Sequence, residues 1–386
     1  MLRLGDRAAA FPSLDAAAYM NHAAIAPIAA PVRAALDATL DDYARRGSAA
    51  FGPMLEVRAR LRERFARLVA AHADEIAFVQ NTTHGVLDVA FGMPWRPGDR
   101  IVTFEGEFPT NVAPFLRAAE TFGLEVDLLS LEPFARSHDE GLEALEAHLA
   151  KRPARLVAVS AVQFQTGLAM PIAAMGALAH RHGARLFVDA IQALGVVPTT
   201  VENVDFLSAG GHKWLLGVEG AGFLYVRREA MGELVPRLSG WLGYEDATDF
   251  LFKGPGHLDY RAPLKRSAEV FETGTSSQLG VVALDASIAM LEALAIPAIF
   301  EHVQRIHDAL EPALEGLGYR SLRAPFTEGR SGILSFDPPP GTSAPELVRR
   351  LATSKVFAAS PDGKLRFSPH FANSTSEVEA VVSALA

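Results

Sequence analysis

The chain has 386 residues, a length that favours two domains, and 49% of them are hydrophobic, enough for a large buried core. The net charge of −9 and the lack of a basic run predict no nucleic-acid partner. The chain contains no cysteine, which excludes disulfides, thiolate metal sites and a cysteine nucleophile. The N-terminal residues do not show the basic-then-apolar pattern of a signal sequence, and we expect a cytoplasmic protein.

Short apolar stretches alternate with helical stretches from about residue 56 to residue 226. This alternation predicts an α/β fold, in which a mostly parallel sheet is covered by helices on both faces. The expected strands are 75–80, 100–104, 125–129, 155–162, 186–189, 205–209 and 222–226, and the expected helices include 85–91, 140–151 and 172–182.

The pattern changes after residue 279, where a long helix at 281–294 leads to a second helix. Strands at 332–336 and 364–367 follow, with a helix at 344–352 between them. We therefore expect a large domain over residues 21–279 and a smaller α+β domain formed by residues 1–20 and 280–386. Asp285 and Glu292 interrupt the apolar stretch 281–300, which predicts a packed helix and no membrane partner.

An aspartate and a lysine follow two of the expected strands. Asp189 ends one strand, and Lys213 follows the next strand 24 positions later. A buried carboxylate needs a cation, and a protonated pyridine nitrogen is one. A partly buried lysine loses its proton easily and can bond an aldehyde. The pair predicts pyridoxal phosphate, although a helix cap is the more common role of an isolated aspartate.

Two further positions fit an anionic cofactor and an amino-acid substrate. Thr82 and Thr83 follow a strand and open a helix, where backbone N–H groups bind phosphate; a plain helix cap is the alternative. Arg366 lies in a short apolar strand, and its guanidinium suits a substrate carboxylate; a structural ion pair is the alternative. No histidine spacing indicates zinc, so we expect no metal.

Together these motifs resemble the class V aminotransferase family of pyridoxal-phosphate enzymes, which includes cysteine desulfurases, isopenicillin N epimerase-like proteins and kynureninase-like hydrolases. The resemblance extends from residues 19–24 to residues 366–370. It implies fold type I, with a seven-stranded sheet, and a homodimer. It also implies that Lys213 forms a Schiff base with the cofactor and moves the proton at the substrate Cα.

The remaining site residues follow from the same resemblance. Asp189 would bind the pyridine nitrogen and Gln192 the ring hydroxyl, while Thr83, with Thr82 near it, would hold the phosphate. The resemblance also implies that His212 lies near the phosphate or the Schiff base, that the ring of Phe108 stacks on the cofactor, that Thr275 reaches the phosphate of the neighbouring subunit, and that Arg366 takes the substrate carboxylate.

The sequence departs from the family pattern at three points. Gly210 and Gly211 stand where many relatives have a serine phosphate ligand, and either Gln163 or Gln165 stands for an asparagine near the cofactor. The lack of cysteine excludes a desulfurase that passes sulfur to its own thiol, but not a lyase that eliminates directly.

Several reactions remain open. Class V aminotransferase-type chemistry is the main prediction; a C–S or β-lyase and an amino-acid epimerase, neither with a cysteine nucleophile, are alternatives. A non-catalytic binding protein on the same fold is an alternative of another class. Substrate choice would fall to residues such as His22, Trp241, Tyr244 and Arg261, although interface packing is the favoured role of the tryptophan and the tyrosine.

Overall fold

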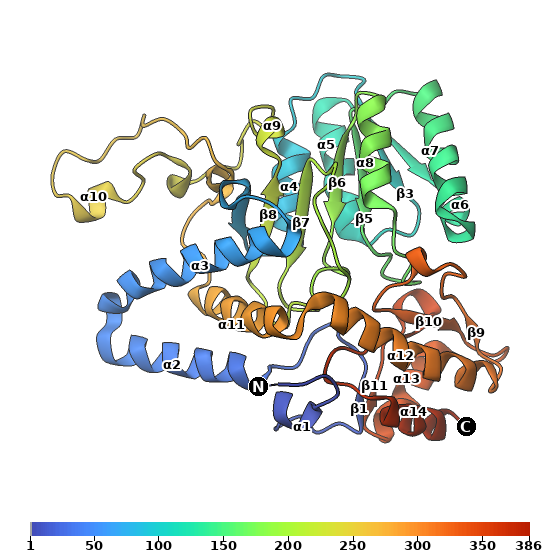
Figure 1. The fold of residues 1–386 in the computed structure, drawn as a ribbon. Coiled ribbons are helices and arrows are strands. Elements are labelled where there is room, and N and C mark those ends of the chain that lie inside the picture. Colours follow the sequence, from blue (N-terminus) through green and yellow to red (C-terminus); the bar gives the residue numbers. More distant parts are fainter. Residues whose placement is uncertain (1) are drawn as a thin grey trace.

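The computed structural model describes residues 2–386, and its main feature is a seven-stranded sheet in the order β2-β8-β7-β6-β5-β3-β4 (Figure 1). β8 runs opposite to the other six strands of this sheet, which confirms the mostly parallel sheet. The strands are β2 (Ile76–Val79), β3 (Arg100–Phe104), β4 (Glu125–Leu129), β5 (Leu156–Ser160), β6 (Arg185–Asp189), β7 (Phe206–Gly210) and β8 (Gly222–Val226).

Helices cover both faces of this sheet. Side chains alternate between the faces along each strand, so Val157 and Val159 join one hydrophobic cluster and Leu156 and Ala158 join another. The second cluster includes residues of α4 (Thr82–Gly92) and α5 (Ala113–Phe122). The first includes residues of α3 (Phe51–Val69), α7 (His138–Lys151) and α8 (Ile172–Arg181).

Two helices join the sheet to the rest of the molecule. Helix α11 (Gln278–Leu294) packs on α2 (Ala30–Arg46) and α3, and Asp285 pairs with Arg60 at 2.6 Å and with Arg64 at 2.8 Å. The carboxylate in this apolar helix is therefore neutralised by α3.

Within residues 2–386 no single helix is long and apolar enough to cross a membrane; α11 and α12 (Ile296–Glu315) pass that test only together and are bent by 76°.

A smaller layer contains both ends of the chain (Figure 1). Strands β9 (Arg320–Ser321), β10 (Leu334–Asp337) and β12 (Leu365–Phe367) form an antiparallel sheet, and β1 (Ala18–Tyr19) pairs with β11 (Val356–Phe357). The N-terminal segment thus joins the C-terminal part, while the division at residues 20 and 279 stays a prediction. The other helices are α1 (Arg7–Ala10), α6 (Glu132–Arg136), α9 (Arg228–Met231), α13 (Ala344–Thr353) and α14 (Val378–Leu385).

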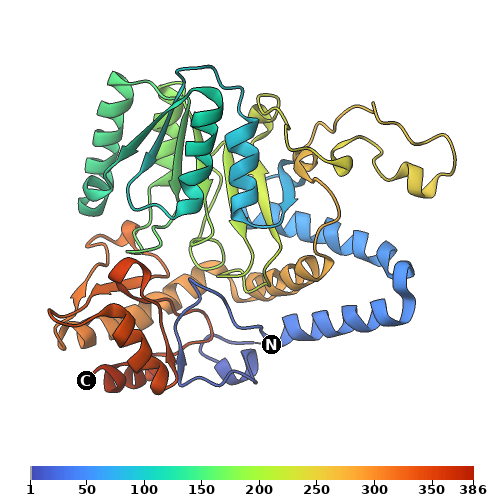
Figure 2. The same ribbon diagram turned by 180° about the vertical axis from the view of Figure 1, so that it is seen from behind.

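One segment extends away from the rest of the molecule. Residues 244–264, which we call the arm, carry α10 (Asp249–Phe252) and project from the body in both views (Figures 1 and 2). Large apolar side chains on the arm are open to solvent, with Phe252 65% exposed and Tyr260 81% exposed. Such surface normally contacts a partner.

Candidate active site

The site lies where the parallel strands end. Asp189 is the last residue of β6 and is only 3% exposed. Its Oδ1 accepts a hydrogen bond from the backbone N–H of Ile191 at 3.0 Å, in a turn rather than a helix. Burial, together with the nearby Glu107 carboxylate, raises the pKa of Asp189 to about 7, although the Ile191 hydrogen bond and the charge of Lys213 oppose this shift. A cationic partner would restore the ionised form.

Lys213 follows β7 by three residues and is partly buried beside the ring of Phe108. Its Nζ lies 5.5 Å from the centroid of that ring. Burial lowers the pKa of Lys213 to about 8; Asp189 opposes this shift and Arg366 reinforces it. Within residues 2–386 no carboxylate lies within ion-pair distance of this amine. A large neutral fraction near pH 8 makes Lys213 a nucleophile.

The start of α4 approaches the end of β7. The backbone N–H of Gly210 donates to Oγ1 of Thr82 at 2.9 Å, and Oγ1 of Thr83 lies 2.7 Å from Oγ1 of Thr110. Asn81 caps the helix through the N–H of His84 at 2.9 Å. A helix N-terminus with hydroxyls beside it favours an anion. Thr82 and Thr83 are thus brought to the same edge of the sheet as Lys213.

Close packing explains why glycines surround this helix start. A Cβ on Gly85 would lie 2.3 Å from Oγ of Ser208 on β7, so only glycine lets α4 come this near. A Cβ on Gly211 would lie 2.5 Å from Leu284 of α11. The serine that many relatives carry before the lysine would therefore fit at position 211 only if the Leu284 side chain moved.

Gln192 is fixed by two neighbours. Its Oε1 accepts from Nε1 of Trp214 at 2.8 Å, and its Nε2 donates to the carbonyl oxygen of Ala23 at 3.1 Å. Because an amide nitrogen carries two hydrogens, one N–H remains to donate. The role of Gln192 at the ring hydroxyl stays a prediction.

Arg366 is a buried cation without a carboxylate. The side chain is 5% exposed, one Nη donates to the carbonyl oxygen of Phe164 at 2.9 Å, and Nε has no partner among residues 2–386. Burial lowers the pKa of Arg366 to about 10. The alternative of a structural ion pair is therefore wrong within the described chain. The guanidinium is available for a carboxylate, which can bind it through two oxygens.

His22 and His212, the two histidines predicted for the site, differ in burial and in their contacts. His22 is 1% exposed; its Nδ1 lies 3.1 Å from the carbonyl oxygen of Ser368, and its ring lies 6.4 Å from that of Trp214. Burial lowers the pKa of His22 to about 4, so the ring is neutral at pH 7. His212 is half-buried, and burial together with Lys213 lowers its pKa. Neither role is decided by these contacts.

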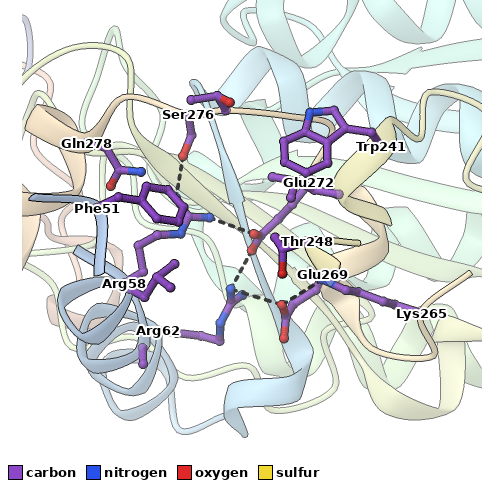
Figure 3. Close-up of a pocket in the computed structure, with 14 residues that line it drawn as sticks. Phe51, Arg58, Arg62, Trp241, Thr248, Lys265, Glu269, Glu272, Ser276 and Gln278 are labelled. Atoms are coloured by element: carbon purple, nitrogen blue, oxygen red, sulfur yellow. Dashed lines mark hydrogen bonds and ion pairs between the residues drawn. The ribbon is translucent and has the colours of Figure 1, made fainter. Parts of the chain in front are cut away.

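Thr275 lies in a different part of the molecule. It is exposed and borders a pocket of about 320 Å³ between α3 and the base of the arm (Figure 3). In this pocket Arg58 donates to Ser276 at 2.5 Å and to Glu272 at 2.8 Å. Lys213 does not line this pocket, and the role of Thr275 toward a neighbouring subunit stays a prediction. Trp241, Tyr244 and Arg261 lie at the base of the arm or on it.

The comparisons with known proteins agree with this geometry. The family model for aminotransferase class-V matches residues 18–380. The chain is 28% identical to an uncharacterized aminotransferase of Bacillus subtilis over 97% of this chain and 95% of the relative. It is 29% identical to a probable cysteine desulfurase of Methanothermobacter thermautotrophicus over 87% and 82% of the two chains.

The chain belongs to the class-V aminotransferase family.

Solved structures have the same fold. The cysteine desulfurase CsdA from Escherichia coli superposes with a TM-score of 0.84 at 25% identity over 98% of this chain and 96% of the other. The cystine C–S lyase C-DES, solved with cysteine persulfide, superposes with a TM-score of 0.88 at 23% identity over 97% and 98% of the two chains. Fold type I is thus confirmed, and this family member is a pyridoxal-phosphate-dependent enzyme.

The described residues fit that cofactor. A buried carboxylate that lacks an ion pair suits a pyridine nitrogen, and a partly buried amine that lacks an ion pair suits an aldehyde. The helix start at Thr82 suits a phosphate. Asp189, Lys213 and Thr82 come from three different strand–loop junctions that meet at one sheet edge, as ligand sites in such sheets do.

Three site residues are absent from the sequence-based prediction. Glu107 is buried beside Phe108, Ser160 ends β5, and Thr110 contacts Thr83. Their signal in the sequence is slight: Glu107 precedes Phe108, and Ser160 ends an apolar run. The structure also separates the two glutamines, since Gln163 is 2% exposed beside Glu107, whereas Gln165 bonds Asp362 near the surface.

Proposed function

We propose that this enzyme transfers the amino group of a free α-amino acid to a keto acid. The observation that carries the proposal is the partly buried Lys213 amine, placed with Asp189 and Arg366 near it and the Phe108 ring beside it. The uncharacterized aminotransferase of Bacillus subtilis, which matches nearly the whole chain, supports the same reaction.

Each residue has a distinct part in this proposal. Bound pyridoxal phosphate supplies an electron sink for negative charge at the substrate Cα. Arg366 holds the substrate carboxylate, which fixes the direction of the Cα–H bond. Lys213, neutral near pH 8, accepts the proton from Cα and returns it at another atom. Asp189 keeps a proton on the pyridine nitrogen, and the Phe108 ring excludes water from one side.

Direct β-elimination from a sulfur-containing amino acid is the second candidate. The chain has no cysteine, so no thiol of its own can accept sulfur. A lyase that releases the sulfur-bearing group from Cβ does not need one, because the Lys213 amine can move the required proton. The solved C–S lyase named above, whose product is cysteine persulfide, supports cleavage of a C–S bond as the form that this elimination takes.

One incubation separates the two reactions. The protein loaded with pyridoxal phosphate is mixed with single amino acids, and the bound cofactor and the products are measured. Aminotransfer predicts conversion of the cofactor to pyridoxamine phosphate with one equivalent of keto acid. Elimination predicts pyruvate and ammonia with the cofactor unchanged. The Lys213→Ala variant is the control, and neither product with any amino acid would contradict the proposal.

We also propose that two copies of the chain assemble, with the arm of one covering the other. The exposed side chains of Phe252 and Tyr260 support this, as does the place of Thr275 in a pocket that borders the base of the arm. Light scattering measures the mass of the assembly, and a monomer at micromolar concentration would contradict the proposal.

Mixed dimers test whether Thr275 crosses between subunits. If it does, a Lys213→Ala chain combined with a Thr275→Ala chain regenerates one intact site. A doubly substituted chain combined with the unaltered chain then regenerates none. If Thr275 serves its own chain, the two results are reversed. Cofactor stoichiometry per dimer gives the readout, once Thr275→Ala alone is seen to bind cofactor weakly.

A further inference from the structure

Glu107 is a buried carboxylate without a cation. It follows β3, precedes Phe108 and is 7% exposed. The backbone N–H of Ser160 donates to its Oε1 at 2.7 Å, Nε2 of Gln163 donates to the same oxygen at 3.0 Å, and the Ser160 hydroxyl donates to Oε2. No lysine or arginine of residues 2–386 lies within ion-pair distance of Glu107. Hydrogen bonds alone are thus available to stabilise a negative charge on Glu107.

These donors favour the ionised form. An amide N–H and a backbone N–H can only donate, so Oε1 must accept from both. Burial raises the pKa of Glu107, and the hydrogen bonds from Gln163 and Ser160 oppose that shift. The three donors form a binding site for the Glu107 carboxylate and compensate for the water that it loses on burial.

This carboxylate-binding site lies beside Asp189. Ser160 faces Asp189 across the neighbouring parallel strands, and the N–H of Ala161 donates to the carbonyl oxygen of Asp189 at 2.8 Å. The residue after Glu107 is Phe108, whose ring adjoins the Lys213 amine. Two buried carboxyl groups therefore lie side by side at this edge of the sheet. Asp189 is the one expected at the cofactor's pyridine nitrogen, and Glu107 is next to it.

We propose that Glu107 is a positioning residue that acts through Asp189: its charge, fixed at the end of β5, favours a proton on the pyridine nitrogen of the bound cofactor. Like charges at close range each make a nearby cation or proton more favourable. Glu107 thus strengthens the attraction of Asp189 for the pyridinium without touching the cofactor. The inference rests on the cofactor of the family and not on which reaction follows.

The test is the Glu107→Gln variant loaded with pyridoxal phosphate that carries ¹⁵N at the ring nitrogen. Glutamine keeps the size and can satisfy the same three neighbours, because its oxygen accepts from Ser160 and Gln163 and its NH₂ donates to the serine hydroxyl. NMR follows the protonation of the ring nitrogen against pH. We expect the variant to lose that proton at a pH lower by about one unit, a tenfold change in the equilibrium.

A matched variant separates charge from packing. Ser160→Ala removes one hydrogen bond and keeps the Glu107 charge, so its ring nitrogen should titrate within about 0.3 units of the unaltered enzyme. An unchanged midpoint in Glu107→Gln, or an equal shift in Ser160→Ala, would overturn the proposal. If Glu107→Gln does not fold, ¹³C NMR of glutamate carboxyls in the unaltered enzyme decides, since a protonated Glu107 at pH 8 contradicts the proposal and an ionised one supports it.

Discussion

Ser160 and Asp189 stand directly opposite each other at the ends of the parallel strands β5 and β6. The strand pairing continues to this point, with the N–H of Ala161 bonded to the carbonyl oxygen of Asp189. The position of the Asp189 carboxylate is therefore set by the sheet itself, which is more rigid than a loop. Because the Asp189 carboxylate is buried without a paired cation, its ionisation should lower the stability of the cofactor-free protein.

Replacing Asp189 with asparagine should stabilise the protein when no cofactor is bound. The folded-state pKa of about 7 lies above the unfolded value, so stability is present below pH 4 and is lost as the pH rises to about 7. Asparagine removes this loss, and at pH 8 we expect a gain on the order of 2–4 kcal/mol. Urea unfolding of the cofactor-free proteins at pH 4.5 and pH 8 measures it.

The low-pH measurement is the internal control, because the two proteins should there differ little. The same variant should bind pyridoxal phosphate far more weakly. Lower stability of Asp189→Asn at pH 8 would mean that the carboxylate already has a cationic partner in the folded chain.

Cofactor loading should depend on pH through Lys213. The attacking species is the neutral amine, so the loading rate should rise with pH and level off above about pH 8, where Lys213 has lost its proton. Because Arg366 lowers the pKa of Lys213, Arg366→Met should move this midpoint to higher pH. Stopped-flow absorbance at a series of pH values gives both midpoints. A plateau reached only near pH 10 in the unaltered protein would show that the amine is not buried.

Arg366→Met should also separate substrate binding from cofactor binding. The guanidinium has no carboxylate of its own, so its loss leaves the fold intact and removes the partner of the substrate carboxylate. We expect KM for the amino acid to rise by about 100-fold, the loss of about 2–3 kcal/mol for a charge-assisted bond. Cofactor affinity should change by less than about threefold. An equal loss of both affinities would assign Arg366 a structural role.

Gly85→Ala should damage the predicted phosphate site. Its methyl group would lie 2.3 Å from the Ser208 hydroxyl, which forces α4 away from β7. We expect a loss of about 1–3 kcal/mol in stability and of at least about tenfold in cofactor affinity. Gly52→Ala is the matched control, because Gly52 also lies in a helix but nothing is within 4 Å of its added methyl group. That change should leave cofactor affinity unaltered and raise stability slightly.

His307→Leu should stabilise the protein against acid. His307 is fully buried in α12, and neither ring nitrogen has a partner among residues 2–386. Burial lowers its pKa to about 3, so stability present above pH 6.5 is lost as the pH falls toward 3. Leucine removes that loss and two unsatisfied atoms; we expect a gain of about 1–2 kcal/mol at pH 8 that grows at lower pH.

Thermal unfolding of both proteins between pH 8 and pH 4 measures the effect, with the exposed His257→Leu as the control. A gain that stays constant with pH would show that His307 is protonated with equal ease in the folded and unfolded chains.

The sheet is the part of the fold that the sequence predicted best. Strands such as β3 and β8 match their predicted bounds because short apolar runs flanked by turns leave little choice. The sequence pattern did not predict helix α2, because many of its residues are exposed and only Val32 and Thr39 are buried. The arm has few regular elements and exposes apolar residues, so no periodic signal marks it.

The site was predicted where a motif is contiguous and missed where it is assembled by folding. Asp189, Lys213 and Thr82 stand next to their own strands, and strand order alone brings them together. Glu107 meets Ser160 across 53 residues, and Thr110 meets Thr83 across 27. No local pattern encodes such contacts, because they depend on how the strands pair and how the segments that follow them come together.

The most direct test of the central claim is chemical trapping of the cofactor. The protein loaded with pyridoxal phosphate is reduced with borohydride, digested and mapped by mass spectrometry. The chain has six lysines, so the labelled one is identified without ambiguity. The account predicts one pyridoxyl group per chain, on Lys213, and none in Lys213→Ala. A label on another lysine, or no label on a folded and loaded protein, would contradict the account.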